Sequence, residues 1–443
     1  MFSDHSGSAM GRRGLLRGTL LGGLGAAGLA GAPIAEARRP RATVQPRRFG
    51  ATVQPTPTVQ PTPLVSGFTH PGLLHTQADF DRMARKVAAG EAPWIDGWNR
   101  LVANGHSSAG WQPRPLATVI RGGTGQNYPQ LYRDIHAAYQ NALRWKVTGQ
   151  EEHAATAVRI LNAWSKNLRE ITGNADRFLA AGIYGYQIAN AAEIVREVDG
   201  FKVSRFGQML ADVFYPLNDR FLTDHNDACI TNYWANWDLC TMASVMAIGV
   251  FNDDQGLFDR AVDYFHHGEG NGALARAVPF VYDGEGLAQW QESGRDQAHS
   301  LMGIGLMATI CEMAWNQGVD LYGADDNRFA KAAEYVARYN SGSDVPFTTY
   351  SWGTGQNCAY REQTFISAGG RGQARPVWEM VYHHYTARRS IAMPNVAAIV
   401  GVPEGGGGDY GPNSGGFDAL GFGTLTHVRV PSNGIPDNLT PLG

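Results

Sequence analysis

Two adjoining segments, QWQESGRDQAHS at residues 289–300 and LMGIGLMATIC at residues 301–311, decide the fold. The second segment is apolar on nearly every side, which is typical of a helix surrounded by other helices. If that helix begins near Ser293, Arg295 and His299 share one of its faces, with Glu292 just before them. Charged groups at the mouth of a buried helix are costly unless they pair or bind a ligand. The pattern indicates either a structural ion-pair cap or a catalytic site. We favour the site, because a cation, a carboxylate and an imidazole occur so close together.

Helical periodicity dominates the rest of the chain. Candidate helices lie near residues 77–89, 129–148, 151–168, 177–198, 203–215, 230–249, 255–267, 294–317, 327–340 and 376–388. Strand patterns are scarce, and we expect short strands only around residues 347–351 and 424–430. Helices joined mostly by short loops predict stacked helical hairpins. We therefore expect an all-α fold, an α/α toroid with few short strands, because polar clusters on several helices need a shared cleft to face.

The N-terminal sequence predicts export. Arg12 and Arg13 precede a weakly hydrophobic run of Gly and Ala, and Ala35-Glu36-Ala37 fits a small-x-small cleavage site. This pattern is typical of a twin-arginine leader at residues 1–37, with a membrane anchor as the alternative. The leader predicts secretion of the folded protein, which would have no membrane contact after the leader is removed.

A linker and one large domain are expected after the leader. Residues 38–65 repeat the motif Ala-Thr-Val-Gln-Pro and are rich in Pro and Thr, which predicts an extended spacer. Residues 66–443 are expected to form the catalytic domain, and their Gly-rich tail should be irregular. The sequence does not determine the oligomeric state.

Charge and cysteine content limit the partners. Residues 1–65 carry a net charge of +6, which leaves −9 for residues 66–443 within the −3 of the whole chain. A domain this acidic does not attract nucleic acid through its overall field, so an anionic ligand must be bound by a few local cations. The cysteines at 229, 240, 311 and 358 lack metal-site spacing, and we expect no metal and no cofactor. One disulfide can form, but the sequence does not select its pair.

A second cluster, ITNYWANWD, occupies residues 230–238. If it is helical, Asn232 and Asn236 share one face, and Tyr233 and Trp237 share the adjacent face. Aromatic rings stack on sugar rings, and amides bind hydroxyl or carboxylate groups. The cluster indicates a sugar-binding surface, with packing of the tryptophans in the core as the alternative.

The two clusters together resemble the alginate lyase-like superfamily of polysaccharide lyases, which are secreted α/α-toroid enzymes. The resemblance extends over most of residues 70–400 and includes the segments 70–76, 173–178 and 292–299. Such lyases commonly hold a uronate carboxylate with an Asn and an Arg, and use a Tyr or His as base and a Tyr as acid. The resemblance implies Asn232 and Arg295 as the carboxylate ligands and His299 as the base. The family often has His after the Asn, where this chain has Tyr233.

β-Elimination explains why such residues are needed. A proton on the carbon beside a carboxylate becomes removable only when fixed donors neutralise the carboxylate and stabilise the enolate. An imidazole is suited to take that proton. The leaving glycosidic oxygen also needs a proton, for which Tyr233 and Tyr350 are candidates. Further substrate contacts are expected from Glu292, Trp237, Asn236, Gln187 and Gln297.

We therefore expect an exported polysaccharide lyase that cleaves a uronic-acid polymer, alginate or a glucuronan, by metal-independent β-elimination. The closest alternative is an inverting glycoside hydrolase on a similar scaffold, which would use two carboxylates. Its candidates are Asp238, Asp283, Glu285, Glu292 and Asp296. A non-catalytic sugar-binding protein is the remaining alternative. Arg375, Glu379 and His383 share a helical face, and we interpret them as structural rather than as a metal site.

Overall fold

The fold is described from a computed structural model, over residues 67–400 without residue 356 and over residues 417–430. These residues all belong to one compact unit, Gln60–Gly443. The predicted leader, the linker and the Gly-rich stretch at residues 405–416 lie outside the described residues.

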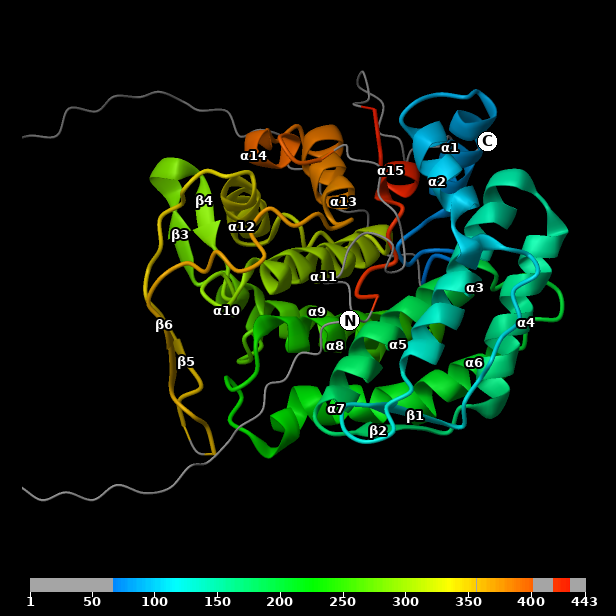
Figure 1. Ribbon diagram of the computed structural model, residues 1–443, viewed down its shortest axis with the longest axis horizontal. Helices are drawn as coiled ribbons and strands as arrows, with labels where there is room; N and C mark the ends of the chain where they lie inside the picture. Colours follow the sequence, from blue (N-terminus) through cyan, green and yellow to red (C-terminus); the bar gives the residue numbers. More distant parts are fainter. Residues whose placement is uncertain (1–66, 356, 401–416, 431–443) are drawn as a thin grey trace, which may run out of the picture. The chain divides into compact units, whose positions relative to one another are not determined.

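Helical hairpins build the fold, as predicted (Figure 1). The main pairs are α3 (Pro129–Thr148) with α4 (Glu151–Asn167), α8 (Ala235–Phe251) with α9 (Gln255–His267), and α11 (Gln297–Asn316) with α12 (Ala324–Asn340). Helix α5 (Asp176–Ile194) packs against both α3 and α8. The arrangement is an α/α toroid, which confirms the predicted fold class.

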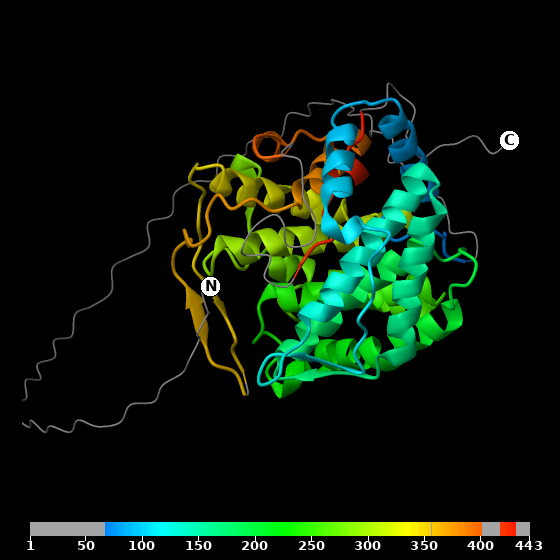
Figure 2. The ribbon, with the colours of Figure 1, turned by 45° about the vertical axis from the view of Figure 1, so that its right-hand side comes forward.

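Shorter elements complete the described part of the chain. The other α-helices are α1 (Gln77–Ala88), α2 (Trp94–Ala103), α6 (Val203–Met209), α7 (Tyr215–Asp224), α10 (Leu274–Ala277), α13 (Trp378–His383), α14 (Pro394–Ala397) and α15 (Gly423–Thr426). The strands pair as β1 (Thr118–Arg121) parallel to β2 (Glu170–Gly173), and antiparallel as β3 (Phe280–Tyr282) with β4 (Leu287–Gln289) and β5 (Tyr350–Trp352) with β6 (Arg361–Gln363). The β5–β6 pair lies at one side of the helices (Figure 2).

The centre of the core is formed by α5, α8 and α11. Residues 300–314 of α11 are all buried, and in α8 every residue except Trp237 is buried. In Figure 1, α11 lies between α12 and α13 on one side and α8 and α9 on the other. The expectation of a surrounded helix at residues 301–311 is therefore confirmed. No helix of the described residues is both long and apolar enough to span a membrane.

Two predicted helix starts were wrong, and both errors fall beside the candidate site. Helix α8 begins at Ala235 rather than near Ile230, because Asn232 N–H closes a turn onto the Cys229 carbonyl and Trp234 has an extended backbone. Helix α11 begins at Gln297 rather than near Ser293, because the Asp296 side chain caps it. Asn232 and Arg295 therefore precede their helices and do not share a helical face with Asn236 and His299.

The predicted strand at residues 424–430 was also wrong. Its first residues form α15, and the segment is buried because it runs through the interior. Arg82 Nη2 donates to the Thr426 carbonyl at 2.8 Å, and Arg429 Nη2 donates to Asp79 Oδ1 at 2.7 Å. The apolar pattern thus reflects burial rather than strand pairing. The predicted helices at 203–215 and 376–388 continue through the π-helical turns Leu210–Phe214 and His384–Arg388.

A disulfide joins Cys229 to Cys358, whose Cα atoms are 5.4 Å apart across a sequence separation of 129. Cys240 and Cys311 are buried free thiols. The bond ties the turn before α8 to the connection between β5 and β6. It therefore holds together two segments that both contribute predicted site residues.

Candidate active site

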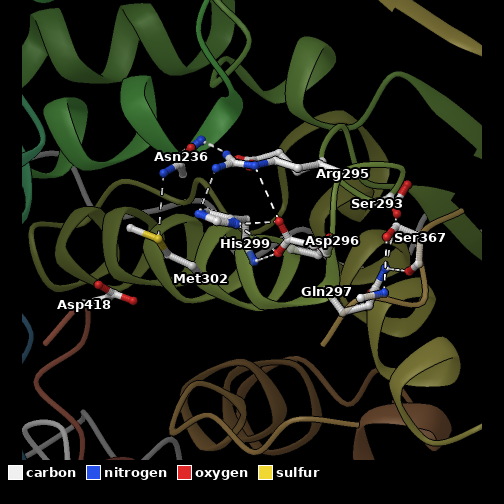
Figure 3. Close-up of polar contacts among 12 residues, drawn as sticks. Asn236, Ser293, Arg295, Asp296, Gln297, His299, Met302, Ser367 and Asp418 are labelled. Atoms are coloured by element: carbon white, nitrogen blue, oxygen red, sulfur yellow. Dashed lines mark hydrogen bonds and ion pairs between the residues drawn. The ribbon is translucent and has the colours of Figure 1, made fainter. Parts of the chain in front are cut away.

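Four polar side chains form a hydrogen-bonded chain at the start of α11 (Figure 3). Asp296 Oδ2 lies 2.8 Å from His299 Nδ1, and Arg295 Nη2 lies 3.0 Å from His299 Nε2. Arg295 Nη1 donates to Glu292 Oε2 at 2.9 Å. Because a guanidinium only donates, His299 Nε2 accepts from Arg295, and Nδ1 donates its proton to Asp296. His299 is therefore a neutral imidazole whose lone pair faces Arg295.

The carboxylates at the two ends of this chain differ in their environment. Glu292 is fully buried, and its Oε1 accepts from the Asn236 backbone N–H at the start of α8 at 2.8 Å. Burial raises the pKa of Glu292, and the charge of Arg295 and the hydrogen bond from the Asn236 N–H oppose the rise. Burial also acts to raise the pKa of Asp296, but its hydrogen bonds with His299 and the charge of Arg295 together outweigh burial, and the pKa is lowered. Asp296 is thus ionised at neutral pH, when it holds the imidazole.

The middle of this hydrogen-bonded chain of side chains is accessible to solvent. The side chains of Arg295, Asp296 and His299 are 24%, 25% and 34% exposed. The Arg295 guanidinium also lies 4.9 Å from the centre of the Trp234 ring, which packs against Trp352. A ligand can therefore reach a guanidinium and an imidazole that are held in place by buried groups.

Tyr233 is oriented from the segment before it. Asn226 Nδ2 donates to Tyr233 Oη at 2.9 Å, and Asn226 Oδ1 accepts from Arg177 Nη2 at 3.1 Å. The Tyr233 ring packs against Trp237, with 4.6 Å between the ring centres. Because Tyr233 Oη accepts a hydrogen bond from Asn226, this contact leaves the phenolic proton of Tyr233 unused. Trp237 is half-buried, so part of its indole remains open to a sugar.

Tyr350 differs from Tyr233 in the state of its hydroxyl. Its O–H donates to Asn271 Oδ1 at 3.0 Å, and Asn271 Nδ2 donates to the Tyr233 carbonyl at 2.6 Å. Burial raises the pKa of Tyr350 to about 12. Its proton is therefore already engaged and hard to release.

Asn232 and Asn236, the two predicted asparagines, differ in their environment. Asn232 precedes Trp234 by two residues, and its carbonyl accepts from Arg361 Nη1 at 3.2 Å. Asn236 is buried and its Nδ2 lies 3.8 Å from Met302 Sδ, a weak contact. Among the described residues, Asn236 Oδ1 has no hydrogen-bond partner. The Asn236 amide is thus enclosed behind the hydrogen-bonded chain, whereas Asn232 is fixed through its main chain in the turn that leads to Trp234.

Two residues predicted to contact the substrate, Gln297 and Gln187, have amides that bond within the protein. Gln297 is buried, and its amide bonds to the Ser293 and Ser367 carbonyls and to Asn340. Gln187 is also buried, and its Nε2 donates to the Phe417 carbonyl at 2.7 Å. Both amides satisfy main-chain groups of distant segments, and a sequence does not show which backbone will pass beside a given side chain.

Sequence reasoning missed Asn226 and Arg177. Asn226 lies in a run of three residues with left-handed φ values, 45° at His225, 54° at Asn226 and 62° at Asp227. Asn and Asp tolerate this conformation better than most residues. The succession His-Asn-Asp before the aromatic cluster was therefore the available signal for an unusual turn.

The carboxylates that a glycoside hydrolase would need already have partners within the protein. Asp238 is fully buried and bonds to His225 and Tyr264 through Oδ1. Asp283 and Glu285 are exposed and pair with cations of α12. Because Glu292 and Asp296 hold Arg295 and His299, the structure favours the lyase over the glycoside hydrolase.

The group on α13 is structural. Arg375 Nη1 donates to Asp418 Oδ2 at 2.7 Å in a buried ion pair, and His383 Nε2 lies 3.1 Å from Glu379 Oε2. In the part of the chain that the structure describes, no group of three or more His, Cys, Asp or Glu side chains is placed to bind a metal ion.

The toroid fold and the match to a family model together identify this chain as a polysaccharide lyase. It belongs to the alginate lyase family, whose model matches residues 118–345, more than half of its 443 residues. The resemblance found in the sequence is thereby confirmed. No curated protein matches the chain.

Solved structures support the fold. The chain is similar to alginate lyase A1-III from Sphingomonas species A1, with a TM-score of 0.50 and 14% identity over 81% of this chain and 98% of that one. A histidine-to-alanine variant of A1-III in complex with a tetrasaccharide gives a TM-score of 0.52 and 14% identity, over 81% of this chain and 97% of that one. An alginate lyase from Bacteroides ovatus gives 0.46 and 15%, over 62% and 84%. At these identities the two A1-III structures show the fold, and the roles of individual residues are argued from this chain alone.

Proposed function

We propose that this protein cleaves a uronic-acid polymer, alginate or a glucuronan, by β-elimination at Arg295 and His299. One observation supports this most strongly: the lone pair of His299 Nε2 lies against the accessible guanidinium of Arg295. A carboxylate bound by that guanidinium would bring its neighbouring carbon close to the imidazole.

Substrate binding would release the base. A carboxylate is a stronger partner for a guanidinium than a neutral imidazole is, because both members of the pair are charged. When a uronate carboxylate takes the Nη2 donor of Arg295, the lone pair of His299 becomes free. The Asn232 amide supplies a second donor to the carboxylate, and Asp296 stabilises the imidazolium that forms.

The acid in this proposal is Tyr233. His299 Nε2 takes the proton from the carbon beside the carboxylate, and the electron pair forms a double bond to the next ring carbon. The bond from that carbon to the glycosidic oxygen breaks, and Tyr233 gives its proton to the leaving oxygen. Asn226, backed by the Arg177 charge, then stabilises the phenolate through its hydrogen bond. Tyr350 is less suited because its proton is bonded to Asn271.

Product masses test the proposal. We expect alginate, polymannuronate or glucuronan to give oligosaccharides with an unsaturated end, formed without the addition of water. Hydrolysis would add one water for each cleavage, and a binding protein would release no new ends. His299→Ala should abolish most product formation while retaining the wild-type melting temperature. Arg295→Ala should do so too, with a lower melting temperature because buried Glu292 loses its partner.

We also propose that the protein is exported through its twin-arginine leader. The Cys229–Cys358 disulfide supports this, because disulfides persist mainly in oxidising compartments. N-terminal sequencing of protein from the culture medium should give a chain that starts after about residue 37. An uncleaved N-terminus on protein confined to the cytoplasm would contradict export.

A further inference from the structure

Arg121 is a cation enclosed by aromatic rings at the end of β1. Its guanidinium carbon lies 5.0 Å from the centre of the Tyr128 ring and 5.6 Å from that of Tyr184. Arg121 Nη1 donates to Tyr184 Oη at 3.3 Å. Tyr184 is buried, whereas Arg121 and Tyr128 are half-buried. A ligand from solution can therefore meet both the guanidinium and one face of a tyrosine.

The β1–β2 pair fixes the position of Arg121. Arg121 is in register with Gly173, where φ is +127° and an added Cβ would lie 2.0 Å from the Arg121 carbonyl oxygen. A side chain at residue 173 would push the strands apart. Arg121 is thus placed by paired strands rather than by a free loop, which suits a binding group.

The environment of Arg121 differs from that of other enclosed arginines. Arg82, Arg375 and Arg388 each pair with a carboxylate, at 2.6 Å, 2.7 Å and 2.9 Å. Among the described residues, no carboxylate lies within ion-pair distance of Arg121. Burial acts to lower its pKa, but Tyr184, Tyr128 and the more distant carboxylates of Asp418 and Asp176 outweigh burial and the pKa is raised. The guanidinium is therefore charged, and no direct ion pair occupies it, so it can still bind an anion. The arrangement points to a ligand that supplies the negative charge.

Arg121 also lies near α8, whose first turn contacts the candidate active site. Asn236, whose N–H binds Glu292, and Cys240 lie one turn apart on α8. Burial raises the pKa of the Cys240 thiol to about 12, and the Arg121 charge opposes the rise. Tyr184 is on α5, which packs against α8. Arg121, through Tyr184 and Cys240, and Arg295, through Glu292 and Asn236, thus both lie beside the first turns of α8.

We propose that Arg121, Tyr128 and Tyr184 form a second uronate-binding subsite. The guanidinium binds the carboxylate of a sugar unit away from the cleaved bond, and the open face of Tyr128 stacks on that sugar. This inference rests on the proposed function, because it places one polymer chain across both arginines. Two cations along the path of the bound polymer favour a polymer of sugar acids over a neutral polymer.

Arg121→Gln tests the subsite kinetically. We expect KM for the polymer to rise about tenfold to a hundredfold with little change in kcat, because a charged hydrogen-bonded contact is lost away from the reacting bond. Arg133→Gln is the matched control, since Arg133 is exposed on α3 and lies 6.0 Å from the Tyr132 ring. Its KM should stay at the wild-type value. Arg121→Lys keeps the charge and should lose less affinity than Arg121→Gln, whereas a folding defect would affect both alike.

A binding experiment separates this inference from the proposed function. Calorimetry in the His299→Ala background measures the affinity for a uronic tetrasaccharide and for its carboxyl-reduced counterpart, without cleavage. Arg121→Gln should remove most of the preference for the acid. An unchanged preference and an unchanged KM would overturn the subsite while leaving the lyase activity intact. A wild-type protein that forms no unsaturated product would overturn the function, and calorimetry would still decide the role of Arg121.

Discussion

In the proposed mechanism His299 is the base, and the residues on either side of its ring fix its tautomer. Asp296 accepts the Nδ1 proton and Arg295 donates to Nε2, so one tautomer is selected. Asp296 also caps α11 by accepting from the His299 N–H at 2.8 Å. A single carboxylate therefore positions the helix start and the imidazole together.

Asp296→Asn separates these two effects. Asparagine still caps a helix, but its amide can donate to Nδ1 and favour the tautomer that carries its proton on Nε2. We expect kcat to fall by about a hundredfold to ten-thousandfold, with an unchanged melting temperature. A kcat close to the wild-type value, from well-folded protein, would exclude His299 as the base.

Asn226 provides the second test at this scale. Asn226→Asp keeps a side chain that tolerates a left-handed backbone and keeps the contact with Arg177, but it cannot donate to Tyr233 Oη. We expect a lower kcat, a changed pH profile, and no further effect of Asn226→Asp in the Tyr233→Phe background. If the two substitutions multiply their losses, Asn226 does not act through Tyr233.

Residue types at the site were predictable, but their partners were not. Glu292, Arg295 and His299 were predicted as site residues because they are charged or titratable and precede an apolar run. The structure joins them by hydrogen bonds. Gln297 lies in the same polar segment, but its amide donates to main-chain carbonyls. Asn226 gained its role from a backbone conformation that local sequence only suggests.

Among the elements, the disulfide anchors the turn that carries Tyr233. Replacing both Cys229 and Cys358 by Ser should lower the free energy of unfolding by about 2–4 kcal/mol, because a long loop in the unfolded chain is no longer closed. We also expect a higher KM, since the turn loses its link to β5 and β6. Thermal melting with and without reductant checks this: reductant should lower the melting temperature of the wild type alone. An equal response of both proteins would contradict the assignment.

His70 links the segment before α1 to the ends of α5 and α8. Its Nδ1 lies 2.5 Å from Glu193 Oε1 and its Nε2 lies 2.9 Å from Asp253 Oδ1, while Arg196 also pairs with Asp253. The hydrogen bond with Glu193 raises the pKa of His70 above 6.5, although burial and the Arg196 charge oppose the rise. Protonated His70 thus favours the folded chain.

The stability from His70 should therefore depend on pH. The folded-state pKa is raised, so this contribution is complete below the unfolded value of 6.5 and is lost as the pH rises through the folded value. We expect the difference in melting temperature between wild type and His70→Gln to be largest near about pH 6 and to shrink towards about pH 9. A difference that is constant or grows with pH would contradict this role.

Helix bounds were predictable where the signal is local. The predicted helix at 255–267 matches α9, whose N-cap Asp254 accepts from the Leu257 N–H, and α3 ends at Gly149 in the left-handed conformation. The start of α11 also carries a local signal, the N-cap Asp296, which the prediction placed inside the helix. The start of α8 depends in addition on a distant partner, because Glu292 accepts from the Asn236 N–H.

At the scale of the whole molecule, the proposed function has an acidic domain act on an anionic polymer through a few arginines. Residues 66–443 carry a net charge of −9, so binding depends on local cations rather than on the overall field. Arg295 and Arg121 are held by buried or paired groups on different elements, and α8 lies near both. In the proposed function, the toroid thereby brings charge neutralisation, a base and an acid into one region.

The most direct test follows ultraviolet absorbance during incubation with alginate, polymannuronate and glucuronan, since a double bond conjugated to the carboxylate absorbs there. Wild type should give rising absorbance with at least one polymer, and Arg338→Ala, which removes a surface ion pair with Glu285, should do the same. Arg295→Ala should lower the rate by about a hundredfold to a thousandfold or more. Folded wild-type protein that produces no absorbance with any of the three, or an Arg295→Ala variant as fast as the control, would contradict the account.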